Sequence, residues 1–312
     1  MAGRYRVVRL MSLLLATGGS GQLAQALRRA RPGQVQVAGR PEFDFEQPES
    51  LAAIILRATP ALVINAAAYT AVDAAEADPT AAARANATGP GRIAEACAAL
   101  GIAMIHISTD YVFDGEKGAP YTEADPTNPT GVYGATKLEG ERAVLAAHPG
   151  AVILRTSWVY ARHGRNFVIT MLRAGKRAPR LRVVSDQVGC PTNADDLAAA
   201  VLGVADRLLR AGKEHDLGGI YHAAGSGHTS WHGLATTIFQ HARGFGWPQP
   251  PIEAIATAAW PTPARRPADS RLDCRRLQET FGVRLPDWQA SLGPAVAAIC
   301  ASEAEALTPV AG

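Results

Sequence analysis

Cysteine is scarce in this sequence, and its spacing argues against a disulfide framework or a zinc site. The 312 residues include four cysteines, which are far apart and form no CxxC pair. Isolated cysteines are typical of reduced thiols in a reducing compartment, which favours a cytoplasmic location. The four are Cys97, Cys190, Cys274 and Cys300.

Long apolar runs and a strong charge imbalance are also missing. No apolar run approaches the about 20 residues that a membrane-spanning helix needs, so we expect no membrane anchor. The formal net charge of +3 is too small to indicate a general nucleic-acid-binding protein. With 47% hydrophobic residues, the composition is that of a globular protein rather than a disordered or fibrous one.

The N-terminus is similar to a secretory signal, because Arg4 and Arg6 precede a short apolar stretch at residues 10–16. The alternative is that this stretch forms a buried first strand that leads into a glycine-rich turn. We favour the strand, because the turn has a role only if the strand is retained. Met11 offers a second start, so residues 1–10 are expected to be an N-terminal extension.

The first half of the chain alternates short apolar runs with alanine-rich amphipathic stretches, which predicts βαβ units around a parallel sheet. The order of these elements predicts an α/β fold with a Rossmann-type doubly wound parallel sheet. The expected strands are residues 12–16, 34–38, 62–65, 103–108 and 151–156, and the expected helices are residues 22–30, 48–59, 81–100 and 134–147.

After Trp158 this alternation ends. A further strand is expected at residues 180–185, and a helix at residues 194–211 is expected to return to the main sheet. Residues 244–267 are rich in Pro, Gly and Ala, so we expect mostly loop there.

These elements divide into two expected units. Residues 11–161 plus about 190–225 are expected to form the dinucleotide-binding Rossmann domain. Residues from about 162–189 plus 226–305 are expected to form a smaller, discontinuous substrate-binding lobe, with the ligand in the cleft between the two.

A glycine-rich turn follows the first predicted strand and opens the first predicted helix. Gly18, Gly21 and Ala24 fit the spacing G-x-x-G-x-x-A. Glycine lets the turn close and lets backbone N–H groups approach a pyrophosphate, while the helix N-terminus supplies partial positive charge. The alternative is a tight turn without a ligand, but its place between strand and helix favours dinucleotide binding.

The end of the second predicted strand bears on the choice of cofactor. An acidic residue there hydrogen-bonds the ribose of NAD, whereas an arginine accommodates the 2′-phosphate of NADP. The sequence has Ala38, Gly39 and Arg40 at this point, and no acid. We therefore expect NADPH, with NADH as the alternative, unless Arg40 is only a solvated loop residue.

Tyr133 and Lys137 have the Y-x-x-x-K spacing at the start of a predicted helix. Residues at i and i+4 project from one helical face, so a phenol and an ammonium can meet one ligand. A cation within about 4–6 Å lowers the pKa of a tyrosine, which suits the phenol to acid–base chemistry on a carbonyl. The spacing alone also occurs by chance on surface helices.

Residues 108–115, at the carboxyl end of the fourth predicted strand, support a catalytic role for Tyr133 and Lys137. Ligands of open α/β sheets bind at that edge, and a hydroxyl beside Tyr133 is the arrangement used by short-chain dehydrogenases. Small residues at 66–68 leave room for a cofactor against the backbone, although compact helix–sheet packing explains them equally well.

Taken together, these segments resemble the dTDP-4-dehydrorhamnose reductase family of extended short-chain dehydrogenases. The resemblance covers roughly residues 12–275 in the right order, and the segments from Arg155 onward are its most specific part. The matching segments are GQL (21–23), VINAAAYTAVDAAE (63–76), STDYVFDG (108–115), NPTGVYGATKLEGE (128–141), RTSWVY (155–160) and VVSDQVGCPT (183–192).

The resemblance implies NADPH-dependent reduction of the 4-keto group of dTDP-4-dehydro-L-rhamnose to dTDP-L-rhamnose. It implies that Tyr133 donates the proton, that Lys137 holds the nicotinamide ribose and lowers the pKa of Tyr133, and that Thr109 hydrogen-bonds the substrate oxygen. Asp110 and Trp158 correspond to substrate contacts, and the alternative for Trp158 is a buried core aromatic. The expected cofactor contacts are Gly18, Gly21, Gln22, Leu23, Arg40, Asp44, Phe45, Ala67, Ala68, Tyr69, Thr70, Tyr133 and Lys137.

The chain departs from the family pattern at two points. Asp269, within RPADSRLD (266–273), stands where the family usually has Asn, which puts a direct role for Asp269 in doubt. The glutamates through which some members bind magnesium at a dimer contact have no match here. We therefore expect no metal ion, and a homodimer is left open.

Two other functions are compatible with the same motifs. One is another nucleotide-sugar short-chain dehydrogenase, either a 4-epimerase that retains NAD or a reductase of a different deoxysugar. The other is a non-catalytic dinucleotide-binding regulatory subunit, similar to that of eukaryotic methionine adenosyltransferase. The presence of both Tyr133 and Lys137 disfavours a binding module.

Residues 142–185 contain no Asp or Glu but several arginines and lysines. As a group beside the expected cleft they could attract an anionic nucleotide diphosphate. The alternative is a basic surface that only confers solubility. The basic residues are Arg142, Arg155, Arg162, Arg165, Arg173, Lys176, Arg177, Arg180 and Arg182.

Overall fold

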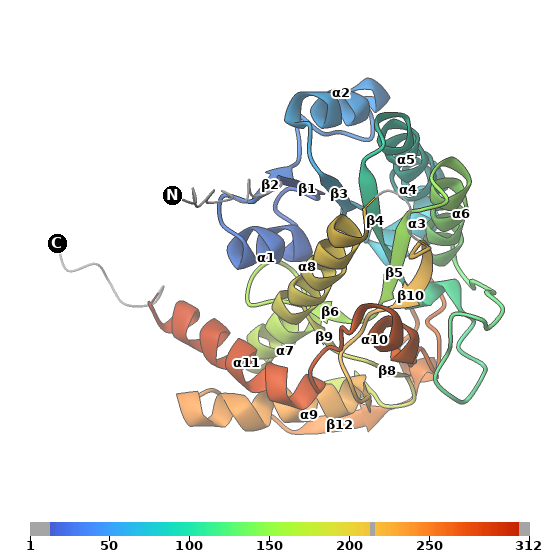
Figure 1. The fold of residues 1–312 in the computed structure, drawn as a ribbon. Helices are drawn as coiled ribbons and strands as arrows, with labels where there is room; N and C mark the ends of the chain where they lie inside the picture. The colour runs from blue at the N-terminus through green and yellow to red at the C-terminus, as the bar shows by residue number, and fades with distance from the viewer. Residues whose placement is uncertain (1–12, 213–215, 306–312) are drawn as a thin grey trace, which may run out of the picture.

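The centre of the molecule is a six-stranded sheet in the order β2-β1-β3-β4-β5-β10 (Figure 1). The computed structural model describes residues 13–212 and 216–305. Every strand pairing in this sheet is parallel, which confirms the predicted α/β fold of Rossmann type. The strands are β1 (Leu14–Thr17), β2 (Val35–Ala38), β3 (Leu62–Asn65), β4 (Ala103–Thr109), β5 (Val152–Thr156) and β10 (Gly219–His222).

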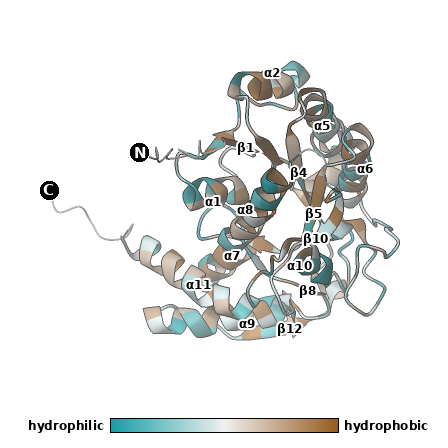
Figure 2. Ribbon diagram, viewed as in Figure 1, coloured by the Kyte–Doolittle hydropathy of each residue, from teal (hydrophilic) through white to brown (hydrophobic). Residues whose placement is uncertain are grey.

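Helices cover both faces of the sheet, because successive side chains of each strand point to opposite sides. Leu14 and Ala16 of β1 pack in one apolar cluster, and Leu15 between them packs in another. Brown, hydrophobic strands lie between helices with mixed faces in Figure 2. One face carries α1 (Gln22–Ala30), α8 (Ala194–Ala211) and α10 (Arg275–Phe281), and the other carries α2 (Pro48–Ala58), α5 (Gly89–Leu100) and α6 (Val132–Ala147).

The chain reverses its direction of growth across the sheet between β1 and β3. From β2 it crosses back over β1 to place β3 on the other side, and β4, β5 and β10 then follow outward. Ligands of doubly wound sheets bind at the carboxyl ends of the strands beside such a switch point. The turn after β1, the segment after β3 and the end of β4 therefore meet at one edge.

Short helical segments shape this edge. The chain after β3 forms α3 (Val72–Ala77) and α4 (Pro79–Ala83), and a π-helical turn, η1 (Arg84–Thr88), leads into α5. A single 3₁₀ turn, η2 (Asp110–Val112), follows β4. Helices with π-helical turns often place functional groups at such irregularities.

A third apolar cluster lies apart from the sheet and joins α7, α9 and α11 through residues such as Leu172, Leu234 and Val296. Short strand pairs surround it, with β7 next to β12, β8 next to β11 and β6 next to β9. The elements are β6 (Val159–Tyr160), α7 (Phe167–Gly175), β7 (Leu181–Val184), β8 (Val188–Gly189), β9 (Thr192–Asn193), β11 (Thr229–Ser230), α9 (Trp231–Ala242), η3 (Arg243–Phe245), β12 (Ile252–Ile255), η4 (Thr257–Ala259) and α11 (Trp288–Glu305).

The structure corrects the sequence prediction in two places, and residues 244–267 are mostly loop as expected, apart from β12 and two 3₁₀ turns. The sheet has a sixth strand, β10, that was not predicted. The helix expected at 81–100 begins at Pro79 and is interrupted by η1. The exact bounds of the two expected lobes stay a prediction, and residues 1–10 lie outside the described residues. No helix in the described part of the chain is long and apolar enough to cross a membrane.

Candidate active site

The glycine-rich turn after β1 is built from backbone that packs against backbone. Gly18 and Gly19 have φ of 115° and 53°, a region that favours glycine. Both N–H groups donate to the Ala38 carbonyl, at 3.0 and 2.9 Å. A Cβ on Gly39 would lie 2.6 Å from the Gly19 Cα, and a Cβ on Gly18 would lie 3.2 Å from the Ala66 oxygen. The ends of β1, β2 and β3 therefore approach one another closely.

The N-terminus of α1 is open for an anion. Gly21 is its N-cap and offers no side-chain hydrogen bond, so the first-turn N–H groups stay free of a side-chain cap. Such a terminus attracts a phosphate. The open N-terminus of α1 is therefore compatible with binding the pyrophosphate of a dinucleotide. The Leu23 side chain is 8% exposed and packs in the core, so any contact of Leu23 with a cofactor involves its backbone.

Gln22, the first residue of α1, is hydrogen-bonded to the N-cap residue of α7. Asn166 Nδ2 donates to Gln22 Oε1 at 2.9 Å. The same carboxamide caps α7, because its Oδ1 accepts from the Ile169 N–H at 3.1 Å. One side chain thus links α7 to the glycine-rich turn.

Arg40 follows β2 as expected, but its guanidinium has partners within the chain. Its Nε lies 3.1 Å from Asp44 Oδ2 and its Nη2 lies 3.5 Å from Glu46 Oε1, while 68% of the side chain is exposed. Phe45 packs edge-on to Phe43 at 5.2 Å and fills the space over Gly89. A 2′-phosphate at Arg40 would have to compete with these carboxylates.

The segment after β3, which carries Ala67, Ala68, Tyr69 and Thr70, is held in place by one buried amide. Asn86 Oδ1 accepts from the Tyr69 N–H at 2.8 Å, and Asn86 Nδ2 donates to the Tyr69 carbonyl at 3.2 Å. Asn86 lies in η1 and was missed by the sequence analysis. An asparagine within an alanine-rich helix was the available signal, because such a residue favours caps and turns over helix interiors.

Thr109, Asp110 and Tyr133 come together at the end of β4. Thr109 Oγ1 donates to Asp110 Oδ1 at 3.0 Å, and Asp110 is 2% exposed. Burial raises the pKa of Asp110 to about 6, against the effect of the Ser270 and Thr109 hydroxyls. The Tyr133 ring lies edge-on to the Tyr111 ring, with 5.4 Å between centroids. Burial raises the pKa of Tyr133 to about 12, and a hydrogen bond with Thr109 opposes this rise.

Helix α6 approaches this edge closely because glycines face its neighbours. A Cβ on Gly134 would lie 2.1 Å from the Tyr111 carbonyl oxygen, and a Cβ on Gly140 would lie 1.9 Å from the Asn86 oxygen. The backbones of η2 and η1 therefore rest directly on α6. This contact fixes the height of Tyr133 and Lys137 above the sheet.

Lys137 is 1% exposed and points into the end of β4. Its Nζ donates to the Ile107 carbonyl at 2.7 Å and lies 3.3 Å from His106 Nε2. Burial lowers the pKa of Lys137 to about 8, and the Glu141 carboxylate opposes this change. The expectation that Lys137 lowers the pKa of Tyr133 stays a prediction: the ammonium is directed at β4, and burial is the largest cause of the pKa shift at the phenol.

A buried ion pair lies one turn further along α6. Arg155 of β5 donates Nε to Glu141 Oε1 at 2.9 Å and Nη2 to Glu141 Oε2 at 2.7 Å. The Ser108 hydroxyl donates to the same Glu141 Oε1 at 2.5 Å. The pair ties α6 to β4 and β5 directly beside Lys137 and Thr109. Its partners lie far apart in the sequence, and Glu141 was not predicted as a site residue.

Trp158 has an unusual backbone, with φ of 47° in the left-handed region. Its ring stacks on Trp231 at 3.4 Å between centroids and 5° between planes, and a Cβ on Gly189 would lie 2.4 Å from it. Trp158 is half-buried, so it is neither a fully buried core residue nor a free surface residue.

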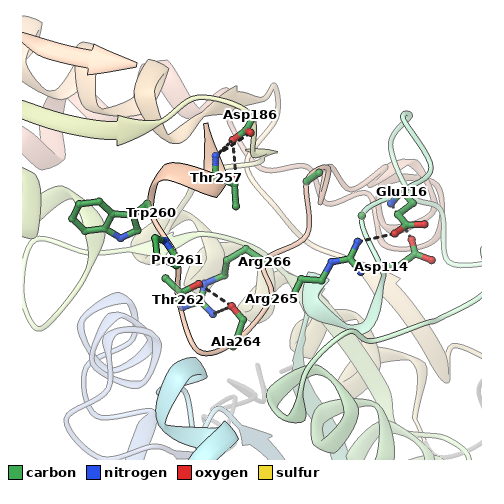
Figure 3. Close-up of a pocket in the computed structure, with 12 residues that line it drawn as sticks. Asp114, Glu116, Asp186, Thr257, Trp260, Pro261, Thr262, Ala264, Arg265 and Arg266 are labelled. Atoms are coloured by element: carbon green, nitrogen blue, oxygen red, sulfur yellow. Dashed lines mark hydrogen bonds and ion pairs between the residues drawn. The ribbon is translucent and has the colours of Figure 1, made fainter. Parts of the chain in front are cut away.

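A hollow of about 370 Å³ lies between residues 114–116, Asp186 and residues 257–268 (Figure 3). Its lining includes Trp260, three carboxylates and the guanidinium groups of Arg265 and Arg266, which pair with Glu116 and Asp73. Tyr133, Lys137 and Thr109 are not part of this lining. The charges nearly balance, so the hollow lacks the cationic excess of a phosphate site. Asp269 nearby is bonded to Arg271 at 2.6 Å.

Five of the nine basic residues of 142–185 have carboxylate partners. Arg155 is buried against Glu141, and Arg173 and Lys176 pair with Glu303. Arg180 and Arg182 face Glu253 at 3.7 and 4.0 Å. Their acidic partners lie outside residues 142–185, so the composition of this segment could not show the ion pairs. Within residues 13–212 and 216–305, no group of three or more His, Cys, Asp or Glu side chains is arranged to hold a metal ion.

Comparisons with known proteins agree with this geometry. The family model of the RmlD substrate binding domain matches residues 11–300. A dTDP-4-dehydrorhamnose reductase from Sinorhizobium fredii is 49% identical over 280 residues, which cover 89% of this chain and 94% of the relative. A Streptomyces antibioticus protein named "Probable dTDP-4,6-dihydroxy-2-methyloxan-3-one 4-ketoreductase" is 40% identical over 293 residues, 93% of this chain and 96% of the relative.

A crystal structure shares the fold. The dTDP-4-dehydrorhamnose reductase of Bacillus anthracis in complex with NADP superposes with a TM-score of 0.83 and 31% identity, covering 91% of this chain and 98% of that one. These matches confirm the resemblance seen in the sequence. The chain belongs to the RmlD substrate binding domain family, the family of the dTDP-4-dehydrorhamnose reductases.

Proposed function

We propose that this protein reduces the 4-keto group of dTDP-4-dehydro-L-rhamnose to dTDP-L-rhamnose with NADPH. The observation that supports the proposal is at the end of β4, where Tyr133 is hydrogen-bonded to Thr109 and Lys137, one turn along α6, donates to the Ile107 carbonyl of the same strand. When bound, the cofactor supplies a hydride to the carbonyl carbon.

The residues at this edge supply the proton and the orientation. Tyr133 is the proton donor to the forming C4 alkoxide, and its phenol is protonated at neutral pH because even an unperturbed tyrosine has a pKa of about 10. Thr109, bonded to both Tyr133 and Asp110, orients the same substrate oxygen. Asp110 and Trp158 contact the substrate. Lys137 holds the ribose next to the nicotinamide.

The cofactor lies along the turn after β1 and the segment after β3. The free N–H groups at the start of α1 and the close backbone approach at Gly18 support this placement. NADPH is favoured by Arg40, and the relative from Bacillus anthracis was crystallised with NADP. The proposed contacts are Gly18, Gly21, Gln22, Leu23, Arg40, Asp44, Phe45, Ala67, Ala68, Tyr69, Thr70, Tyr133 and Lys137.

The test is an assay that follows NADPH oxidation with dTDP-4-dehydrorhamnose and identifies the product by NMR. We expect stoichiometric oxidation of NADPH and formation of dTDP-L-rhamnose. Absence of turnover, with the protein folded and NADPH bound, would rule out the proposal.

A different deoxysugar reductase is the second candidate, because one relative at 40% identity carries the name of a 4-ketoreductase of another dTDP-sugar. A panel of dTDP-4-keto sugars separates the two by their relative kcat/KM. An isolated protein that retains NAD through its cycle would instead indicate an epimerase. A cytoplasmic location and a homodimer stay predictions.

A further inference from the structure

A row of polar side chains crosses the core of the sheet and ends at Lys137. Thr17, Asn65 and His106 are neighbours in the register of β1, β3 and β4. Thr17 Oγ1 lies 2.7 Å from Asn65 Oδ1, Asn65 Nδ2 lies 3.0 Å from His106 Nδ1, and His106 Nε2 lies 3.3 Å from Lys137 Nζ. His106 and Asn65 are 0% exposed. Buried polar groups are costly unless each one is satisfied.

Counting donors and acceptors shows how this row can be satisfied. With the Asn65 amide nitrogen toward His106, Nδ1 must accept, so the ring proton lies on Nε2 and faces the Lys137 ammonium, which only donates. Two donors would then meet. Turning the carboxamide by half a turn lets His106 Nδ1–H donate to Asn65 Oδ1, and Nε2 is left to accept from Lys137. Asn65 Nδ2 then donates to Thr17 Oγ1, which reverses the bond from the Thr17 hydroxyl to Asn65 Oδ1.

We propose that His106 is a positioning residue that holds Lys137 in place and favours its charged form, through a neutral ring that carries its proton on Nδ1. The proposal rests on the role of Lys137 in the proposed function. Burial keeps the ring neutral by lowering the pKa of His106, and the positive charge of Lys137 acts in the same direction. Asn65 fixes the tautomer, as second partners of histidine commonly do.

The arrangement leaves one N–H of Lys137 for a ligand. An ammonium has three donors, and here the Ile107 carbonyl and His106 Nε2 accept two of them. The far end of the row reaches the other side of the proposed cofactor site. Thr17 directly precedes Gly18, and Thr17 Oγ1 accepts from the Ala67 N–H at 3.2 Å.

Other charged groups around α6 have partners of their own or lie further along the helix. Asp73 pairs with Arg266, Arg92 with Glu95, and Glu141 with Arg155. Among the described residues, the Lys137 ammonium hydrogen-bonds with Ile107 and His106. Titratable side chains also lie on α6 and on the elements packed against it. They are Asp73 and Glu76 on α3, Arg84 on η1, Arg92, Glu95 and Cys97 on α5, His106 on β4, Asp110 and Tyr111 on η2, Tyr133, Lys137, Glu139, Glu141 and Arg142 on α6, and Arg155 on β5.

The tautomer is tested directly by NMR of the ¹⁵N-histidine-labelled protein without substrate at pH 7. The His106 signals are assigned by their loss in His106→Gln. We expect a neutral ring protonated on Nδ1, with an unprotonated Nε2. A ring protonated on Nε2, or a charged imidazolium, overturns the proposal. This measurement needs no turnover, so it stands even if the substrate is a different sugar.

The role is tested by the pH dependence of kcat/KM and of the Kd for NADP⁺. His106→Leu removes the acceptor that stabilises the charged form of Lys137, so the pKa of Lys137 should fall. The alkaline limb of both profiles should therefore shift to lower pH by about one to two units. His106→Gln, which keeps an acceptor oxygen, should leave the limb within about half a unit of wild type. His222→Leu is the matched control, because His222 is also 0% exposed, on β10.

The two variants and the control give a clear decision. A shifted limb in His106→Leu, with an unshifted limb in His106→Gln and His222→Leu, supports the proposal. An unshifted limb in a folded His106→Leu protein overturns it, as does an equal shift in His222→Leu. If His106→Leu does not fold, the tautomer and the profile of His106→Gln still decide, since a limb displaced in His106→Gln contradicts the acceptor role.

Discussion

Arg155 and Glu141 form a two-pronged ion pair inside the core, at 2.9 and 2.7 Å, with 2% of each side chain exposed. Removing one partner of a buried pair leaves an uncompensated charge, which typically costs about 3–5 kcal/mol. We therefore expect Glu141→Gln to lower the free energy of unfolding by about that amount in urea titrations.

The double variant Glu141→Leu/Arg155→Met is the control for this pair. It removes both charges together, so its loss of stability should be clearly smaller than the sum of the two single losses. Additive losses would show that the two side chains do not stabilise the fold as a pair.

Tyr133→Phe removes the proposed proton donor and keeps the ring. We expect kcat to fall by about 10²- to 10⁴-fold, the usual contribution of a positioned acid, while the Kd for NADP⁺ changes little. The neighbouring Tyr111→Phe, whose ring lies edge-on to Tyr133, is the control and should retain most activity. Near-normal turnover in Tyr133→Phe would assign the proton transfer to another group.

Asp110 should make the protein less stable as the pH rises. Burial raises its pKa from 3.8 to about 6, so between these values the folded state binds the proton more tightly than the unfolded chain. Wild type therefore loses stability through this window, by up to about 3 kcal/mol. We expect the advantage of Asp110→Asn over wild type, measured by urea unfolding, to grow from pH 4.5 to pH 7.

Asp125→Asn provides the comparison for this pH series. The hydrogen bond from Lys117 holds the pKa of Asp125 at about 2, so its carboxylate stays charged across the measured range. The stability difference for Asp125→Asn should stay flat between pH 4.5 and pH 7. A flat curve for Asp110→Asn as well would mean that Asp110 is ionised in the folded state throughout.

Arg40→Ala tests the choice of cofactor. If Arg40 leaves Asp44 and Glu46 to bind the 2′-phosphate, its loss should lower kcat/KM for NADPH by about 10- to 100-fold and leave the value for NADH nearly unchanged. Arg57→Ala, at an exposed arginine on α2, is the control. An unchanged NADPH to NADH ratio would show that Arg40 only forms ion pairs with its neighbours.

Gly39→Ala tests the close packing of the glycine-rich turn. The new Cβ would lie 2.6 Å from the Gly19 Cα, so the turn has to move. Strain of about 1–3 kcal/mol corresponds to a Kd for NADP⁺ raised by about 5- to 150-fold. Gly244→Ala, which meets no atom within 4 Å, should leave the Kd unchanged. Equal affinities in both variants would mean that the turn does not position the cofactor.

Apolar runs and helical periodicity in the sequence predicted the strands and helices whose form depends on residues that are neighbours in the chain. The strands β1, β3 and β5 are runs whose residues are buried on both faces, and Gln22–Ala30 is a helix at the predicted residues. Strand β10 was missed because Gly219–His222 is a short run that becomes a strand only by pairing with β5, far away in the sequence. Its strand character is set by the partner rather than by its own residues.

The site shows the same division. The sequence predicted the positions of Tyr133, Lys137 and Thr109, because a helix face and a strand end fix where such side chains lie. The hydrogen-bond partners of Lys137 could not be predicted from the sequence. His106 is one polar residue inside an apolar strand, and its contact with Asn65 depends on the register between β3 and β4. Likewise, the ion pairs of Arg173 and Arg180 depend on Glu303 and Glu253.

The carboxamide of Asn166 also bears on where the molecule can flex. Its oxygen caps α7 and its nitrogen also donates to the Ala161 and His163 carbonyls, so the side chain is fixed on the α7 side whether or not it holds Gln22. Movement of α1 away from α7 would therefore cost the single bond to Gln22 and leave α7 capped. The glycine-rich turn can move at this point without loosening the α7 N-terminus.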